Sequence, residues 1–579
     1  MTAAWLLLAV LPAQEIDTVI FEKDRKAFRL LDQVESAAER ASLENIFTTR
    51  DPAERLRRAE AFLSGHPDSA FLSVVYEVAA RSCIDLRRPQ CVWENAARSL
   101  RLLPENPLLL VSLAEAQAAA GHKAGAQESA RRALHYLDRF APPSGYTPAQ
   151  WKALEPKLRA SAIRTLGVAP ATRPRPRQGP ARYAGTDACK SCHTREHQAW
   201  SMTGMARMLR PYRPENVFGK FGGDAYRENG LLIRAITDEG RHWFELKGQR
   251  FPVDYTIGSK WQQAYATKMP DGRIQVFPIQ YNRLTGGWIN YWRGIDPPGS
   301  ARAEAVRFLD FGETMNYQIN CVPCHTSQSR LHGAEEKAEA IGYAEPGVNC
   351  EMCHGPSAGH AAGGPANFSF ARLDAQSYVD ICAQCHRQSA IFQPGARGER
   401  NYSGLAPDFT LNARSRPYIE FSRKAFFKDG RFRETTFIVE AFERTKCFQK
   451  GGAHCGHCHN PHPADAPANL KSLKFVDQPD RMCTGCHPKN AGRQHTRHVP
   501  GSEGSQCVAC HMPKITNTVG FRARTHRIDD IPDAAMTVRF GPAGSPNACL
   551  ACHPGEDPAA LLRTRTSAQA GSNAAEQRR

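Results

Sequence analysis

Apolar and small residues in the first third of the chain recur with the spacing of paired helices. Pro107 can begin a helix, and Gly121 can make the turn that follows it. The first helix would carry Leu110, Leu113 and Ala114 on one face, and the second would present Ala126, Ala130, Ala133 and Leu134. Small residues allow two antiparallel helices to pack closely. We therefore predict a domain of helical repeats over residues 15–167.

This part of the chain resembles the tetratricopeptide repeats. The small and apolar positions of that family are matched by Leu113, Ala114, Gly121, Ala126 and Ala133, and the segment 71–107 has the same layout about one repeat period earlier. The Trp and Tyr of the family pattern are absent, so a general array of α-hairpins is the alternative. Either array implies a surface that binds another protein.

The pattern changes to that of β-hairpins in one part of the remaining chain. The segment LLIRAITDEGRHWFEL predicts two strands with a turn at residues 238–240, and YATKMPDGRIQVFPIQYN predicts a second hairpin with a turn at residues 270–272. Elsewhere, residues 183–557 predict short helices and long loops. We therefore expect a mainly α fold with a small β insertion.

The two ends of the chain and one internal segment have compositions of their own. The start, MTAAWLLLAVLPAQ, has an apolar centre and a small residue, Ala13, where a signal peptidase can cut. We expect a signal peptide in residues 1–14, with an apolar helical start as the alternative. Residues 168–182 are rich in proline and arginine and predict a stiff linker, and residues 558–579 predict a disordered tail.

The cysteines give the strongest functional signal. Sixteen of the 19 fall in eight Cys-x-x-Cys-His motifs, the attachment signature of c-type haem, in which two thiols add to two vinyl groups and the histidine binds the iron. The motif cysteines are Cys189, Cys192, Cys321, Cys324, Cys350, Cys353, Cys382, Cys385, Cys455, Cys458, Cys483, Cys486, Cys507, Cys510, Cys549 and Cys552. The proximal iron ligands would be His193, His325, His354, His386, His459, His487, His511 and His553.

We therefore expect eight covalently attached c-type haems. Zinc is a poor alternative because its sites do not need a histidine directly after each second cysteine. Most motifs lie too close together for independent protein cores, so the haems themselves should form the core of a cytochrome domain over residues 183–557. Covalent haem attachment takes place outside the bacterial cytoplasmic membrane, so we expect an exported protein, on the periplasmic or extracellular side.

Three cysteines lie outside the motifs. Cys83 and Cys91 flank a short segment between two helical stretches, where they can form a disulfide or remain two buried thiols. Cys447 has no partner by this count, and we expect it to pack near a haem.

The formal net charge of +17 favours a nucleic-acid partner at first sight. Each haem brings two propionates, however, and eight haems would offset much of that charge. We expect the lysines and arginines to hold propionates, and we expect no nucleic-acid partner.

Residues 183–557 resemble the multihaem cytochrome c-554 family, whose relatives include octahaem hydroxylamine oxidoreductases and octahaem tetrathionate or nitrite reductases. The matching stretches are YAGTDACKSCHTREHQAWSMTGMARM, GVNCEMCHGPSAGH, CGHCHNPH and QHTRHVPGSEGSQCVACHMPK, followed by THRI. Histidines at four places in that family bind the irons of other haems from the distal side. By position, the resemblance implies the distal ligands His360, His462, His498 and His526.

The supply of further distal ligands is small. Ten histidines of the haem region lie outside the motifs, and eight haems with two histidines each would need eight of them. Apart from the four already named, they are His197, His242, His332, His454, His457 and His495. His457 lies inside its own motif and cannot easily cap that haem, and His454 directly precedes Cys455, so we expect a structural role for it.

Met205 marks a departure from the family. Relatives often have a distal histidine at this place after the first motif, whereas this chain reads WSMTGMARM. We expect the Met205 thioether to bind a neighbouring haem iron, which would raise the potential of that haem. The alternative is that Met205 packs against a porphyrin.

We expect an exported octahaem electron carrier whose helical repeats dock a redox partner protein. The related reductases carry a Cys-x-x-Cys-Lys motif at the active haem, but all eight motifs here end in histidine. No tyrosine is marked for a haem crosslink either, so catalytic residues are unknown. The alternative is a multihaem oxidoreductase that acts on nitrite, hydroxylamine, tetrathionate or a similar small compound at one five-coordinate haem. Membrane attachment stays open.

Overall fold

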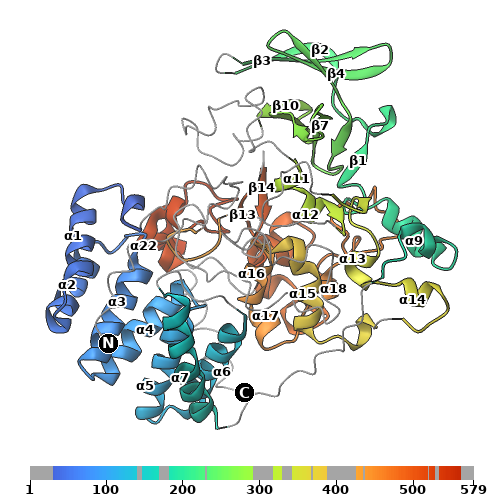
Figure 1. Cartoon of the computed structure of the whole chain (residues 1–579). Coiled ribbons are helices and arrows are strands. Elements are labelled where there is room, and N and C mark those ends of the chain that lie inside the picture. Colours follow the sequence, from blue (N-terminus) through green and yellow to red (C-terminus); the bar gives the residue numbers. More distant parts are fainter. Residues whose placement is uncertain are drawn as a thin grey trace.

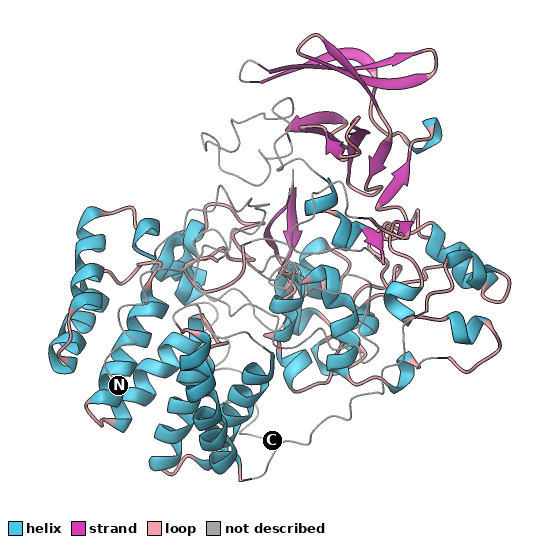
Figure 2. Ribbon diagram, in the orientation of Figure 1, coloured by secondary structure: helices cyan, strands magenta, loops and turns pink. Residues whose placement is uncertain are grey.

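A computed structural model of the chain describes residues 30–139, 146–167, 182–228, 231–290, 317–328, 342–366, 369–387, 426–433, 437–518, 521–528 and 534–561. Long helices form one side of the molecule, strands gather at the opposite end, and short helices with loops lie between them (Figures 1 and 2). The predicted signal peptide, nearly all of the predicted linker and the tail from residue 562 onward lie outside the described residues.

Seven long helices follow one another near the N-terminus. They are α1 (Ala37–Thr48), α2 (Pro52–Gly65), α3 (Leu72–Asp85), α4 (Pro89–Leu102), α5 (Pro107–Ala119), α6 (Lys123–Arg139) and α7 (Pro148–Leu166). Each helix packs against the next one along the chain. Asn106 caps α5 by accepting hydrogen bonds from the amides of Leu108 and Leu109. These helices lie within the range where helical repeats were predicted.

The contact between α5 and α6 depends on small side chains. Gly121 has a φ of +79° in the turn between them, a conformation that favours glycine. Ala130 and Ala133 of α6 are completely buried, so the two helices can approach closely. One helix pair earlier, Cys83 of α3 and Cys91 of α4 form a disulfide with their Cα atoms 5.7 Å apart. Of the two states predicted for these cysteines, the structure has the disulfide.

The expectation of a mainly α fold with a small β insertion is wrong, because the strands build a region of several sheets. The first sheet has the order β2-β3-β4-β5, and the second has the order β1-β6-β7-β9-β10 with β8 paired to β7. Both predicted hairpins are present within them, since Asp238 pairs with Arg241 and Lys268 pairs with Ile274. The missed strands are three or four residues long, or polar and exposed like β2, and so lack a readable alternation of apolar and polar residues.

The strands of these two sheets occupy residues 209–290. They are β1 (Leu209–Pro211), β2 (Gly222–Glu228), β3 (Leu231–Asp238), β4 (Arg241–Leu246), β5 (Gln249–Pro252), β6 (Tyr255–Ile257), β7 (Gln262–Lys268), β8 (Ile274–Val276), β9 (Ile279–Asn282) and β10 (Gly287–Asn290). Two small sheets add β11 (Thr326–Ser327) with β12 (Glu345–Pro346) and β13 (Lys514–Thr518) with β14 (Phe521–Arg524).

The Cys-x-x-Cys-His region consists of short helices. They are α8 (Thr186–Lys190), α9 (Thr194–Ser201), α11 (Tyr317–Asn320), α12 (Val322–His325), α13 (Glu351–His354), α14 (Ala358–Ala361), α15 (Ala375–His386), α16 (Ile438–Glu443), α17 (Lys446–Gln449), α18 (Cys455–Cys458), α19 (Arg481–Thr484), α20 (Arg493–Thr496), α21 (Cys507–His511) and α22 (Ala534–Gly544). One apolar cluster here centres on only four buried residues, Val379, Ala383, Val439 and Phe442. This cluster therefore supplies only a small apolar core.

The long helices are joined to the motif region by one buried ion pair. The Arg444 guanidinium donates to both carboxylate oxygens of Glu105, at 2.5 and 2.8 Å, and both side chains are almost completely buried. Arg444 also lies 4.1 Å from the ring centre of Phe432, which belongs to the same apolar core as the helices. The backbone of Gly430 approaches Leu102 so closely that a Cβ atom would meet the Leu102 carbonyl oxygen at 2.0 Å. The two parts thus share one interface.

We predict that Glu105→Gln destabilises the haem-loaded protein by about 3–5 kcal/mol, because it leaves the Arg444 charge buried without its counter-charge. Urea unfolding followed by circular dichroism measures the change. The control is Glu128→Gln, which breaks an exposed pair with Arg131 and should change stability by less than about 0.5 kcal/mol. Equal losses in the two variants would contradict the role given to the buried pair.

Candidate haem sites

Each motif forms one tight turn that gathers its three reactive side chains. In six motifs the amide of the histidine donates to the carbonyl oxygen of the first cysteine, for example from His193 to Cys189 at 2.9 Å and from His553 to Cys549 at 2.8 Å. The other two motifs, those of His386 and His511, lie at the ends of helices α15 and α21. A single turn places residues i and i+3 or i+4 on one side. Both thiols and the imidazole can therefore meet one porphyrin.

Five motif histidines face a second histidine from elsewhere in the chain. Their ring centres are 6.1–6.5 Å apart, and three of the five pairs are close to parallel. The pairs are His193 with His360, His354 with His462, His459 with His526, His511 with His495, and His553 with His498.

These separations fit a haem iron held between two imidazoles. Two rings on opposite sides of one metal ion need about 6.3 Å between their centres, since each metal–nitrogen bond is about 2 Å long. Two imidazoles in direct contact would lie much closer, as the tilted rings of His454 and His457 do at 4.0 Å. The spacing of the five pairs therefore matches the donor set that a six-coordinate haem requires.

Hydrogen bonds orient several of these rings. The Nδ1 atom of His360 lies 3.0 Å from the Gly364 carbonyl oxygen, that of His459 lies 3.0 Å from Lys471, and that of His498 lies 2.7 Å from Thr496. A carbonyl oxygen can only accept, so Nδ1 carries the hydrogen and Nε2 is left as the metal-binding atom.

Burial keeps other ring nitrogens unprotonated. It lowers the pKa of His526 to about 4, helped by the neighbouring His459 and His386. The pKa of His354 is also lowered to about 4, by burial first and then by His462 and His193. A metal ligand must be the neutral imidazole, so these environments suit iron binding at neutral pH.

The four distal ligands implied by the family resemblance all lie opposite a motif histidine, and so does His495, a candidate histidine that the sequence left unassigned. It lies only three residues before His498, and nothing in RQHTRH tells which of the two would bind. Helix α20 ends at Thr496, and the next residue, Arg497, turns the chain with a left-handed φ of 59°. The two histidines consequently face different motifs.

Three motifs differ from the other five. In the part of the chain that the structure describes, no second histidine ring lies opposite His325, His386 or His487 at such a separation. His332, one of the candidate histidines, lies outside the described residues. Of the others, His197 contacts Trp200, the His242 Nδ1 atom lies 3.0 Å from the Tyr212 hydroxyl, and His454 stacks on Tyr378.

Met205 lies in a segment beside the third motif, since its carbonyl oxygen accepts from the Val348 amide at 3.0 Å. Its role as a ligand stays a prediction.

Lys260 packs against Gly204, next to Met205. A Cβ atom at Gly204 would meet the Lys260 Cε atom at 2.4 Å, so the glycine leaves room for this lysine. Burial lowers the pKa of Lys260. The pKa of His386 is lowered by burial, by His459 and by Lys260, so this lysine, which no sequence signal marked, lies near the fourth motif.

Cysteines of different motifs lie beside one another and join the motifs into a continuous series. Thiols within hydrogen-bonding distance are Cys189 and Cys350, Cys324 and Cys385, Cys382 and Cys455, and Cys483 and Cys507. Electrostatic contacts add Cys353 with Cys385, Cys458 with Cys486, and Cys510 with Cys549 and Cys552. Numbered along the chain, the motifs follow one another as first, third, fourth, fifth, sixth, seventh and eighth, and the second lies beside the fourth.

Cys447 lies between the fifth and sixth motifs, in electrostatic contact with Cys458 and Cys483. Its expected packing near a haem stays a prediction.

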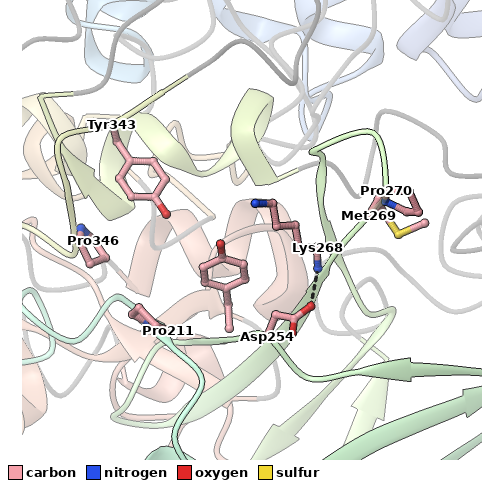
Figure 3. A pocket seen from close by; sticks show the side chains of 8 residues that line it. Pro211, Asp254, Lys268, Met269, Pro270, Tyr343 and Pro346 are labelled. Carbon is pink, nitrogen blue, oxygen red and sulfur yellow. Dashed lines mark hydrogen bonds between the residues drawn. The ribbon is translucent and has the colours of Figure 1, made fainter.

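A pocket of about 600 Å³ opens on the β side of the second motif. The Tyr343 side chain and the Lys268 ammonium point into the same space from opposite walls (Figure 3). Tyr343 and Tyr255 are hydrogen-bonded to each other, and burial is the main cause that raises the pKa of Tyr343 to about 12. Both tyrosines, like Cys321, also pack on the apolar cluster that contains Tyr317 and Val322. The pocket is lined by Pro211, Asp254, Tyr255, Lys268, Met269, Pro270, Tyr343 and Pro346.

None of the helices in the described part of the chain has both the length and the apolar character that crossing a bilayer requires.

Comparison with known families agrees with the motif geometry. The family model of cytochrome c554 and c-prime matches residues 290–355, which include the second and third motifs. A model of the doubled CXXCH motif matches residues 447–492, which include the fifth and sixth.

Two curated proteins are similar to this chain. The dissimilatory sulfite reductase MccA of Wolinella succinogenes is 21% identical over 408 residues, which are 60% of this chain and 53% of that protein. The multiheme cytochrome MtrA of Shewanella baltica is 22% identical over 276 residues, 40% of this chain and 76% of that protein. The chain thus spans about half of the sulfite reductase.

Among solved structures, the outer cell wall cytochrome OcwA is similar with a TM-score of 0.43 and 18% identity, over 66% of this chain and 86% of that one.

The repeated attachment turns, the histidine pairs at the spacing of axial ligands and the two family matches agree with one another. The chain is a multihaem c-type cytochrome.

Proposed function

We propose that the chain binds eight c-type haems and conducts electrons along them. The observation that carries this proposal is the continuous series of motifs, in which each motif lies beside the next through its cysteines. Haem supplies reversible one-electron reduction at each step of such a series. The protein contributes attachment, axial ligands and short distances between neighbours.

The series has two ends and one side branch. Cys192 of the first motif and Cys549 and Cys552 of the eighth are exposed, so electrons would enter and leave near these motifs. Cys486 of the sixth motif is exposed as well. The second motif lies beside the fourth, off the main series, and its Val322 is completely buried.

The proposed axial ligands follow the histidine pairs. His360, His462, His526, His495 and His498 would bind the haems of the first, third, fifth, seventh and eighth motifs from the distal side. Met205 would supply a thioether to a further haem near the third and fourth motifs.

We also propose that the protein is exported. Covalent haem attachment takes place outside the bacterial cytoplasmic membrane, and the disulfide between Cys83 and Cys91 suits an oxidising compartment. The helical repeats would dock a redox partner with the surface that their own contact with Arg444 and Phe432 leaves free.

A second candidate function is the reduction or oxidation of a small sulfur or nitrogen compound at the haem of the second motif. Two observations favour it: no described histidine ring lies opposite His325, and the pocket with Tyr343 and Lys268 adjoins that motif. The similarity to a sulfite reductase makes a sulfur oxyanion the first compound to test.

We predict eight haems per chain by pyridine haemochrome assay, with a low-spin majority in the EPR spectrum of the oxidised protein. Far fewer haems per chain would contradict the proposal.

Turnover of sulfite, nitrite or hydroxylamine, together with a high-spin component in the EPR spectrum, would favour the enzyme. In that case Lys268→Met should slow turnover at least tenfold, while Lys152→Met, a change on the exposed face of α7, should leave it unchanged. A protein whose haems are all low spin and that turns over none of these compounds would contradict the enzyme and support the electron carrier.

We predict that His462→Ala converts one haem per chain from low spin to high spin, because it removes the ring opposite His354. The number of covalently bound haems should not change. His197→Ala is the control, since that ring contacts Trp200 and, among the described residues, faces no motif histidine at axial-ligand spacing. An unchanged EPR spectrum in His462→Ala would show that the pair does not hold an iron.

We predict a weak near-infrared band of thioether-bound ferric haem that disappears in Met205→Ala and persists in Met208→Ala. The haem that loses the thioether should also become high spin. Absence of the band from the unmodified protein, or its survival in Met205→Ala, would show that Met205 only packs near a porphyrin.

A further inference from the structure

The proximal histidine of the second motif has an unusual hydrogen-bond partner. Its Nδ1 atom lies 3.2 Å from the hydroxyl oxygen of Tyr317, and the Tyr317 side chain is completely buried. Tyr317 begins helix α11, and its carbonyl oxygen accepts from the Cys321 amide at 2.8 Å. The tyrosine is therefore fixed to the motif by its backbone as well as by its ring.

Other proposed ligands meet a different kind of partner. The Nδ1 atoms of His360, His459 and His498 each face a backbone carbonyl oxygen. A carbonyl oxygen is a strong acceptor that no substitution of its own side chain removes. The phenol oxygen of tyrosine is a weaker, uncharged acceptor, and it belongs to a side chain that a single substitution can remove.

The partner of Nδ1 influences the iron through the imidazole ring. A ligating histidine donates its other N–H to a nearby acceptor, which fixes the tautomer and the ring orientation and increases the basicity of the metal-binding nitrogen. A more basic ligand stabilises the ferric state and lowers the haem potential. The strength of the acceptor is therefore one determinant of the potential.

We propose that Tyr317 is a positioning residue that orients His325 and sets the potential of the haem at the second motif. Because its acceptor is weaker than a carbonyl oxygen, this haem would be easier to reduce than it would be with a carbonyl partner. The inference rests on the proposed haem at Cys321 and Cys324. It does not depend on whether the protein is a carrier or an enzyme.

The chain offers a matched control nearby. Tyr343 lies close enough to Tyr317 for the two side chains to interact electrostatically, but its hydrogen bond goes to Tyr255. Tyr343→Phe therefore removes one hydroxyl group from the same wall of the protein without touching His325.

The test is a spectroelectrochemical titration of the full haem-loaded chain. In Tyr317→Phe, one of the eight haem components should shift to a more positive potential, because Nδ1 loses its acceptor, and the other seven should stay in place. Tyr343→Phe should titrate like the unmodified protein. An unshifted titration in Tyr317→Phe, or an equal shift in both variants, would overturn the proposal.

Mass spectrometry of the peptide around Cys321 and Cys324 separates the possible failures. If the unmodified peptide carries no haem, both the eight-haem proposal and this inference fall. Should Tyr317→Phe fail to assemble, 3-fluorotyrosine at position 317 keeps the size and the hydroxyl but weakens the acceptor. It must then shift the same single component in the same direction, and no shift would overturn the role of Tyr317.

Discussion

The motif region is organised around pairs of imidazoles from distant segments, which face each other at the spacing that the two axial ligands of one iron would need. A gap of 6.1–6.5 Å between ring centres recurs in five pairs, although the partners are separated by 16 to more than 160 residues of chain. Each such pair would act as a crosslink through a metal ion, added to the two covalent bonds of the motif itself. This explains how short helices with few buried apolar residues can hold a defined arrangement.

The helical domain and the motif region are joined by a different kind of contact. Apolar packing around Phe432 and Phe437 surrounds one buried ion pair, Glu105 with Arg444. Arg444 directly follows α16, so the ion pair fixes the chain immediately before Cys447 and the fifth motif. The helices therefore form a wall for part of the haem region and are more than an appended binding module.

The sequence predicts the chemistry of haem attachment more completely than it predicts the arrangement of helices and sheets. Eight motifs with fixed spacing specify attachment and proximal ligands locally, and the four family-based histidines all lie opposite a motif. His495 was missed because the turn at Arg497, and not the residue pattern, decides which way it faces. The size of the β region was missed because β1 and β6 are only three residues long and β2 is polar and exposed. Tyr317 was missed because its side-chain contact with His325 depends on the fold and leaves no pattern in the sequence.

The order of the paired histidines along the chain has a consequence for maturation. His193, His354 and His459 each precede the histidine that faces them, whereas His495 and His498 precede their motifs. A chain that emerges N-terminus first would hold its early sites half-assembled until later segments arrive. The last two sites would be complete as soon as their own motifs appear. A chain truncated at its C-terminal end would thus lose distal ligands at sites far upstream of the missing segment. The haem spectrum would show this loss of ligands even where the remaining chain keeps its fold.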